Sequence, residues 1–445
     1  MEDDGSATRR DRSIRLAVLT SILSKGGTAL LQLLAIPLAV RVMGREEFGL
    51  YTSVGLTLST IVLLEVGVGP ALAHGLSEAR AKGDGEKARR LVSTALVLIV
   101  GLALIAGIML ASVLALVPIP TLFGPEYAGM ESLMRPALWM GLVLFLLIFI
   151  LNLTDRLREG LLEVARTNAW GAAGNVLAAV SVSIGVWFVP EVWFLVLAIH
   201  GSVVLAKLGN TVMLWRKHPD LLPSLRGFDR GTARHLFTDG AAFATCCLLV
   251  GVVEYNFCTW MVGQLHGPSQ VALYGIFVTL SVMQLGFVIM LSTPTWPAVA
   301  EALARGDLEW ARKAGKKLYL YGLAFATCSF IGMVSLGPWA LEVWLGEKFA
   351  GIPRGLLAAY SFYFVAHVWR HMNHALMIGT GQVMALARVQ FLETGVLALA
   401  AWFALKYGCM GYMLVAMAVV IFSATGWVLP LKVRQRLQPN QESDA

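Results

Sequence analysis

Residues 78–84 read Glu-Ala-Arg-Ala-Lys-Gly-Asp, and residues 301–307, which lie 223 positions later, read Glu-Ala-Leu-Ala-Arg-Gly-Asp. A second pair of similar stretches follows at a spacing of 222, where residues 124–129 correspond to residues 346–351. The two pairs occur in the same order along the chain. This order indicates that the chain consists of two copies of one structural unit.

The composition is that of a membrane protein. Hydrophobic residues make up 57% and charged residues 14% of the 445 positions, and the mean hydropathy is +0.70. Soluble domains average about 25% charged residues. Apolar segments of about 20 residues, the length that crosses a bilayer, recur along the whole chain. We predict an all-α polytopic protein with about twelve spans, near residues 14–42, 48–74, 91–117, 133–154, 168–189, 191–214, 237–262, 271–297, 318–343, 355–378, 387–406 and 409–431.

The placement of Lys and Arg predicts the orientation. Most of the 35 basic residues fall in the two terminal segments and in loops on the same side, such as residues 80–90, 216–234 and 305–317. The positive-inside rule therefore predicts that both termini are cytoplasmic. The net charge of +7 favours anionic lipid headgroups. No nucleic-acid-binding module is recognised, so we expect membrane lipids rather than nucleic acid as partners.

Six spans in each copy give both halves the same polarity in the membrane, which predicts parallel repeats related by an axis along the membrane normal. In membrane proteins such repeats are typical of transporters whose site lies between the halves. The predicted organisation is a cytoplasmic segment (1–13), an N-lobe (14–214), a cytoplasmic linker (215–236), a C-lobe (237–431) and a cytoplasmic tail (432–445).

The repeated stretch itself favours a capped turn between two helices. Gly83 and Gly306 suit the position after a helix end, where the backbone takes a positive φ. Asp84 and Asp307 then suit the N-cap of the next helix. A cytoplasmic gate is the alternative function of this turn.

Several short motifs, taken in their order and spacing, resemble the O-antigen and exopolysaccharide flippases of the MATE-related superfamily of exporters. The resemblance covers most of the N-terminal half and extends more loosely into the C-terminal half. The motifs are Ile22–Gly27, Pro37-Leu38, Gly44–Tyr51, Glu65–Gly69 and Phe123–Tyr127.

This resemblance implies a two-lobed, V-shaped carrier of twelve or fourteen helices in the bacterial cytoplasmic (inner) membrane. Its cargo would be a lipid-linked oligosaccharide, namely an O-antigen (lipopolysaccharide) or exopolysaccharide repeat unit on a polyprenyl diphosphate. Alternating access would move this cargo from the inner to the outer leaflet. A glycan polymerase and glycosyltransferases of the same pathway are further expected partners.

Two charged residues of the first two spans are candidates for contact with the diphosphate or with each other. Lys25 lies about eleven residues into the first span, and Glu65 lies at a comparable depth in the second. Charged groups at this depth are costly and mark function by default. Either Lys25 binds phosphate with Glu65 as its resting partner, or the two form a structural pair.

The tenth span carries six polar side chains on one helical face, roughly 100° wide at 100° per residue. Arginine binds phosphate through two parallel hydrogen bonds, and aromatic rings can stack on sugars. The face is expected to line the cargo cavity or to form a polar seam between helices. A metal site is not expected, because no carboxylate or Cys accompanies the histidines at ligand spacing. The six are Tyr360, Tyr363, His367, Arg370, His371 and His374.

The seventh span contains Glu254 and Asn256, a candidate site for a coupling ion, either a proton or sodium. Polar packing between helices is the alternative. Glu393 in the eleventh span is a weaker candidate. We expect no other cofactor.

Three functions compete for this chain. The flippase is favoured, because Lys25, Arg370 and the histidines suggest a site for anions. A MATE-like, ion-coupled exporter of small molecules or cationic drugs would favour an acidic cavity. A glycan polymerase or glycosyltransferase usually carries a large outer loop or a carboxylate constellation, and all outer loops here are short. No nucleotide-binding motif is present, so ATP-driven transport by this chain alone is not expected. We therefore expect a transporter and not an enzyme.

Overall fold

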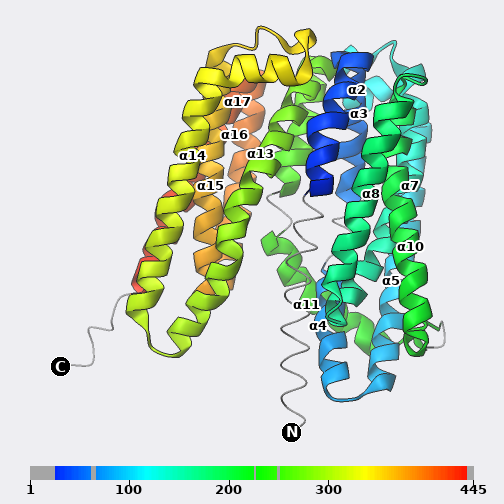
Figure 1. Ribbon diagram of the computed structural model, residues 1–445, viewed down its shortest axis with the longest axis vertical. Helices are drawn as coiled ribbons and strands as arrows, with labels where there is room; N and C mark the ends of the chain where they lie inside the picture. Colours follow the sequence, from blue (N-terminus) through cyan, green and yellow to red (C-terminus); the bar gives the residue numbers. More distant parts are fainter. Residues whose placement is uncertain (1–25, 62–66, 225–226, 248–250, 438–445) are drawn as a thin grey trace. The chain divides into compact units, whose positions relative to one another are not determined.

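The computed structural model describes residues 26–61, 67–224, 227–247 and 251–437. All regular secondary structure in these ranges is helical (Figure 1). Eight helices in them are long and apolar enough to cross a membrane. Within the described ranges, each of the twelve predicted spans overlaps one or more helices, which confirms the all-α fold. Lys25 and Glu65 lie outside the described residues.

The chain divides into two compact units, the two lobes of the fold. The first comprises Met1–Ala244 with Gly267–Ala272, and the second comprises Thr245–His266 with Leu273–Ala445. This division falls within α11 (Arg230–Cys247) and α13 (Cys258–Ala304). The lobe boundaries given above from the sequence stay predictions.

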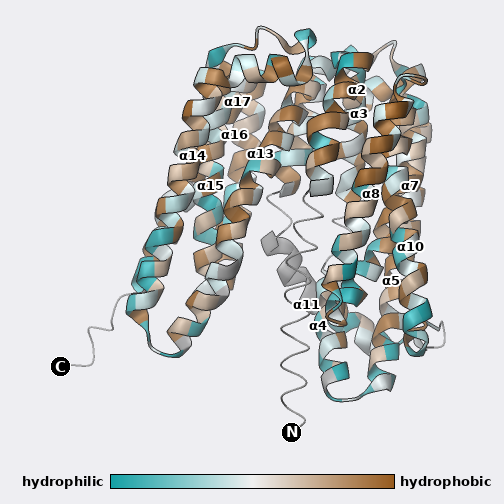
Figure 2. Cartoon of the chain, viewed as in Figure 1, coloured by the Kyte–Doolittle hydropathy of each residue, from teal (hydrophilic) through white to brown (hydrophobic). Residues whose placement is uncertain are grey.

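In the first unit, α7 (Glu131–Gly160) is central and packs against α3, α4, α5, α9 and α10 (Figure 1). Its buried side chains, such as Leu138, Leu142 and Phe149, form much of the core. Apolar residues predominate along these helices, while hydrophilic residues gather at the turn between α4 and α5 (Figure 2). The other elements are η1 (Leu31–Ala35), α2 (Ile36–Met43), α3 (Arg45–Ser59), α4 (Val68–Ala81), α5 (Gly85–Leu116), α6 (Ile119–Phe123), η3 (Pro125–Tyr127), α8 (Val164–Gly185), α9 (Val192–Val196), η4 (Leu197–Gly201), α10 (Ser202–Lys217) and η5 (Pro219–Leu221).

In the second unit, α15 (Arg354–Gly379) is central and packs against α14 and α17. Its residues Phe364, Val368 and Met372 belong to a core that also includes Leu318 and Leu429. The remaining elements are η7 (Val252–Phe257), α13, α14 (Leu308–Leu345), η8 (Glu347–Phe349), α16 (Val383–Lys406) and α17 (Met410–Leu437).

The repeated stretch forms the predicted capped turn in both units. Gly83 has φ 70° and Gly306 has φ 78°. The Asp84 carboxylate accepts a hydrogen bond from the backbone N–H of Lys87 at 2.8 Å. Asp307 accepts one from the N–H of Trp310 at 3.0 Å. These contacts confirm the capping role of the motif.

The second sequence pair also has the same backbone in both units. Gly124 (φ 121°) and Gly346 (φ 90°) each precede a single turn of 3₁₀ helix. That turn buries the ring of Tyr127 in one unit and of Phe349 in the other, each at 0% exposure. The duplication seen in the sequence is therefore a duplication of local structure.

A further pair of turns has the same geometry without the same residue. After α15, Gly381 (φ 73°) donates to the Ile378 carbonyl at 3.0 Å. After α7, Leu162 takes this position with φ 58° and donates to the Glu159 carbonyl at 3.0 Å. The left-handed conformation costs about 1–2 kcal/mol for a residue with a Cβ. The turn after α7 is therefore strained, whereas its counterpart is relaxed.

Candidate functional site

Arg370 on α15 lies in a buried charge cluster of the second unit. Its Nη2 donates to Oε2 of Glu254 on η7 at 2.6 Å, and its Nη1 donates to Oε1 of Glu393 on α16 at 3.1 Å. The arginine side chain is 3% exposed, and each carboxylate is 1% exposed. Three elements distant in sequence therefore meet at one guanidinium group.

His367 extends this cluster one helical turn along α15. Its Nδ1 lies 3.2 Å from Oε2 of Glu254 and 3.0 Å from Nη2 of Arg370. The Tyr363 hydroxyl lies 3.4 Å from the same Nδ1. Tyr274 on α13 donates to the backbone carbonyl of Glu254 at 2.5 Å, which fixes the η7 backbone beside the cluster. We call Glu254, His367, Arg370 and Glu393 the Arg370 cluster.

The Arg370 cluster carries one positive group against two carboxylates, so it has a net charge of −1 when His367 is neutral. Among the described residues, Oε1 of Glu254 and Oε2 of Glu393 have no hydrogen-bond partner. The Thr425 hydroxyl interacts with the Glu393 side chain and donates to the Ile421 carbonyl at 2.8 Å. A buried acceptor without a partner costs about 1–3 kcal/mol, and more when it is charged. The cluster is therefore chemically able to take up a proton or a small cation.

The rest of the polar face of α15 contacts neighbouring helices. The Tyr360 ring stacks on Phe277 at 4.6 Å between centroids. His371 Nε2 lies 2.9 Å from the Ser292 hydroxyl, and His374 Nδ1 lies 3.0 Å from Nε2 of Gln390. These contacts form a polar seam toward α13 and α16. Asn256 lies two residues after Glu254 on η7.

The structure thus brings together Glu254, Tyr363, His367 and Arg370, and it adds Glu393 as a direct partner. Sequence spacing placed the α15 residues on one face but contained no signal for which carboxylates meet them. The π-helix η7 includes Glu254, and such segments are frequent at functional sites. Among the described residues, no group of three or more His, Cys, Asp or Glu side chains is arranged to hold a metal.

A second charge cluster, in the first unit, was missed by sequence reasoning. Arg158 near the end of α7 is fully buried. Its Nε donates to Oδ1 of Asn210 at 2.6 Å, its Nη2 donates to the Asn210 carbonyl at 3.1 Å, and its Nη1 donates to Oε2 of Glu163 at 2.6 Å. The predicted fourth span stopped at residue 154, so Arg158 was assigned to a basic loop. The helix continues to Gly160 and carries the guanidinium group into the bundle.

Glu163, the residue before α8, is in contact with further basic side chains. Lys217 donates to Oε1, His218 Nε2 lies 3.2 Å from the same atom, and Arg166 donates to Oε2 at 3.2 Å. Burial raises the pKa of Glu163, but the hydrogen bonds from Lys217 and His218 and the charge of Arg166 outweigh this effect and lower the pKa below its usual value. We call Arg158, Glu163, Asn210 and Lys217 the Arg158 cluster. It joins the ends of α7, α8 and α10.

The fold is similar to those of solved transporters. An inward-facing multidrug resistance MATE family transporter of the MOP superfamily matches with a TM-score of 0.81 at 16% identity, over 96% of this chain and 100% of the other. An outward-facing structure with the same description gives 0.62 at 17% identity, over 97% of each chain. A MOP superfamily transporter from Pyrococcus furiosus, described as having a binding pocket of reverse polarity, gives 0.65 at 17% identity, over 96% of each chain.

These identities show the fold alone. No curated protein matches the chain in sequence. A family model described as polysaccharide biosynthesis protein, however, matches residues 17–303, which is more than half of the chain. This match confirms the family resemblance drawn from the motifs. The chain is therefore a multi-pass membrane protein that belongs to the polysaccharide biosynthesis protein family and has the two-lobed fold of MOP superfamily transporters.

Proposed function

We propose that this protein is a flippase that moves a polyprenyl-diphosphate-linked oligosaccharide, an O-antigen or exopolysaccharide repeat unit, by alternating access. Movement runs from the inner to the outer leaflet of the bacterial cytoplasmic membrane, with both termini in the cytoplasm. The observation that carries this proposal is the polysaccharide biosynthesis family match on a chain with a transporter fold. Glycosyltransferases would supply the cargo, and a glycan polymerase would consume it.

The Arg370 cluster is the proposed coupling site. Arg370 is the seventeenth of the 26 residues of α15, about 24 Å from the start of a helix that rises 1.5 Å per residue. If α15 forms the predicted tenth span, residues 355–378, this position lies within the membrane, where an excess negative charge is unfavourable. A proton or sodium ion at the free oxygen of Glu254 or Glu393 would remove that excess.

Coupling would follow from competition for the guanidinium group. In the observed state both carboxylates occupy Arg370. Neutralising one carboxylate weakens one ion pair and frees an Nη group for a phosphate oxygen of the cargo. His367 and Tyr363 lie beside that group. Lys25, Tyr360, His371 and His374 remain proposed contacts to the diphosphate or sugar, and Asn256 remains a proposed contact to the ion.

Substitution of Glu254 tests the coupling role. We expect Glu254→Gln to keep the side-chain volume while removing the charge, so glycan export no longer responds when the ion gradient is collapsed. Glu131→Gln, which changes an exposed carboxylate paired with Arg135, is the matched control. Export by Glu254→Gln that stays fully gradient-dependent would argue against this role.

Deletion of the gene followed by mass spectrometry of lipid extracts tests the function. Loss of a flippase predicts accumulation of complete polyprenyl-diphosphate-linked repeat units, reversed by the wild-type chain. An unchanged lipid pool would contradict the proposal.

A MATE-like exporter of cationic compounds is the second candidate, because the acidic excess of the Arg370 cluster suits a cationic substrate. This function predicts increased sensitivity to cationic drugs after deletion, without accumulation of lipid-linked glycan. Mass spectrometry of lipid extracts and drug sensitivity of the deletion strain therefore separate the two candidates.

A further inference from the structure

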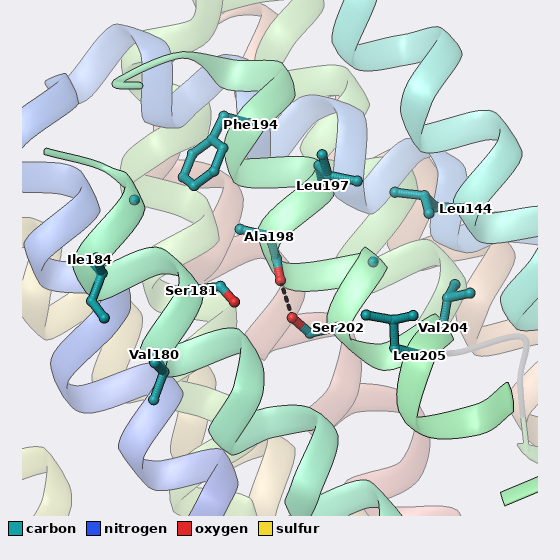
Figure 3. A pocket seen from close by; sticks show the side chains of 12 residues that line it. Leu144, Val180, Ser181, Ile184, Phe194, Leu197, Ala198, Ser202, Val204 and Leu205 are labelled. Carbon is teal, nitrogen blue, oxygen red and sulfur yellow. Dashed lines mark hydrogen bonds between the residues drawn. The ribbon is translucent and has the colours of Figure 1, made fainter. Parts of the chain in front are cut away.

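A groove of about 670 Å³ opens between α8 and the consecutive elements α9, η4 and α10 of the first unit (Figure 3). Small residues, including Ser181, Ala198 and Gly201, line it together with larger apolar side chains such as Phe194 and Leu205. The Arg370 cluster lies in the other unit, so the groove is a separate feature.

The groove exists because close packing of α8 and α10 is confined to part of their length. A Cβ added to Gly174 would lie 3.0 Å from the Cβ of Ala206, and one added to Gly209 would lie 2.6 Å from the Trp170 ring. On the N-terminal side of this contact, α10 is preceded by the π-helix η4. A π-helix has more residues per turn than an α-helix, so the side chains of η4 point in directions that a continuous α-helix would not give. Gly185 allows the Phe194 ring to lie against α8 at the far end.

The groove offers a hydrocarbon surface to its surroundings. Val180, Ile184 and Leu205 are 47%, 59% and 61% exposed. The Ser202 hydroxyl donates to the Ala198 carbonyl at 2.6 Å, so it is satisfied within its own helix (Figure 3). The segment Val192–Lys217 is long and apolar enough to span a membrane. Apart from Ser181 and Ser202 the lining side chains are apolar or glycine, so a polar ligand would lose most of its hydrogen bonds with water here, which disfavours it.

The length and rim of the groove identify the kind of molecule that fits. From Phe194 to Leu205 the helix rises about 16 Å, which is about half of a 30 Å hydrocarbon core. At the end near the α8–α9 turn, Trp187 and Phe188 are 65% and 79% exposed. Exposed aromatic residues of this kind mark the membrane–water interface. The groove would therefore extend from one membrane–water interface to about the middle of the bilayer. This is the depth that the acyl chains of one leaflet reach.

We propose that this groove binds one acyl chain of a membrane phospholipid, with the headgroup at the α8–α9 turn. At that turn Trp193 Nε1 donates to Glu191 Oε2 at 2.5 Å, which places an indole ring and a carboxylate at headgroup level. An acyl chain matches the groove because both extend over one leaflet. The site would hold a structural lipid against α8 and α10, independently of the transported cargo.

Photolabelling tests this site in the full-length protein. The protein is reconstituted in vesicles of phosphatidylcholine and phosphatidylglycerol with a trace of phosphatidylcholine that carries a diazirine on its acyl chain. After irradiation, mass spectrometry locates the adducts. We expect labelling of the groove segments to exceed that around Ile108 of α5, whose side chain is 69% exposed, by about tenfold, a preference of about 1.4 kcal/mol.

Variants that fill the groove make the test specific. Ser181→Phe is expected to remove the excess labelling, whereas the matched control Ile108→Phe leaves it unchanged. If Ser181→Phe does not fold, Ala198→Leu serves as the smaller filling variant. The proposal would be overturned if the groove and α5 were labelled equally and Ser181→Phe left this labelling unchanged. The label would then report contact with bulk lipid only. Displacement of the label by a trace of added polyprenyl phosphate would also overturn it, because the occupant would then be an isoprenoid chain.

Discussion

Each of the two units buries an arginine on its central helix, and the comparison separates a structural cluster from a functional candidate. Arg158 uses all three nitrogens on Asn210 and Glu163, close to a helix end. Arg370 instead binds two carboxylates, each of which keeps one oxygen without a partner among the described residues. The first cluster contains more cations than anions beside solvent-exposed loops. The second has an acidic excess beside the seventeenth of the 26 residues of α15.

This difference shows that burial of an arginine does not by itself indicate a site. The carboxylate of Glu163 is bound by three basic side chains in addition to Arg158. It therefore has no free acceptor to offer a further ion. The Arg370 cluster has two such acceptors and one guanidinium group, so its pairing can change when a proton or cation arrives.

The largest effect is expected for Arg370→Ala. Removal of the guanidinium group leaves two buried carboxylates unpaired, which costs about 3–5 kcal/mol of folding free energy. Glycan export should also be abolished, even in protein recovered at normal abundance. Thermal unfolding in detergent and export in the deletion strain measure the two effects. Arg135→Ala, which removes an exposed arginine paired with Glu131, is the control. Near-normal export by Arg370→Ala would remove the functional distinction between the clusters.

A smaller loss of stability is expected for Arg158→Met. The methionine fills part of the space, while the side-chain oxygen of Asn210 loses its hydrogen bond, which costs about 1–3 kcal/mol. Export per folded molecule should remain normal, because this cluster joins helix ends and takes no part in the proposed coupling. Export normalised to protein in the membrane is the measurement. A selective loss of export would make the Arg158 cluster functional as well.

The third expectation concerns pH. The pKa of Glu163 is lower in the folded protein than its usual value of 4.5. The ionised carboxylate therefore stabilises the folded state at pH values above 4.5, and this stabilisation is lost as the pH falls through the folded-state pKa. Wild type should therefore be more stable than Glu163→Gln at pH 7, and the difference should shrink in acid. Unfolding temperatures of both proteins from neutral to acidic pH test this. A difference that stays constant with pH would contradict the lowered pKa.

The smallest effect is expected at the strained turn. Leu162→Gly should stabilise the first unit by about 1 kcal/mol, because glycine adopts a positive φ without the penalty of a Cβ. Little packing is lost, since Leu162 is 59% exposed. The reciprocal change Gly381→Leu should destabilise the other unit by about 1–2 kcal/mol. Thermal unfolding of both variants and of wild type measures these changes in stability. If both substitutions stabilised the protein, or both destabilised it, this account of the strained turn would be wrong.

Local patterns in the sequence predicted much of the fold. The twelve apolar segments coincide with helices, and Gly83, Asp84, Gly306 and Asp307 form the expected capped turns. These features depend on residues within one helix or turn, so hydropathy and spacing are sufficient. The polar face of α15 was predicted for the same reason. The roles of its residues in cargo binding stay predictions.

The candidate site could be predicted only in part. Spacing at 100° per residue brings Tyr363, His367 and Arg370 together, but Glu254 and Glu393 lie on other elements, more than 20 residues away in sequence. Nothing in the amino-acid order gives the rotation of η7 or α16 about its axis. The groove between α8 and α10 could not be predicted either, because it results from the packing of these two helices.

By itself, the sequence determined that this chain crosses a membrane repeatedly, contains a duplicated unit and belongs to the polysaccharide biosynthesis protein family. Those properties follow from hydropathy, glycine and aspartate positions, and short motifs. Only the tertiary structure decided which buried charges meet. It gave Arg158 hydrogen-bond partners for all three of its side-chain nitrogens, and it left one oxygen each of Glu254 and Glu393 without a hydrogen-bond partner among the residues that the structure describes. The physical reason is that ion pairing depends on distances of about 3 Å between groups on different helices, and helix packing sets those distances.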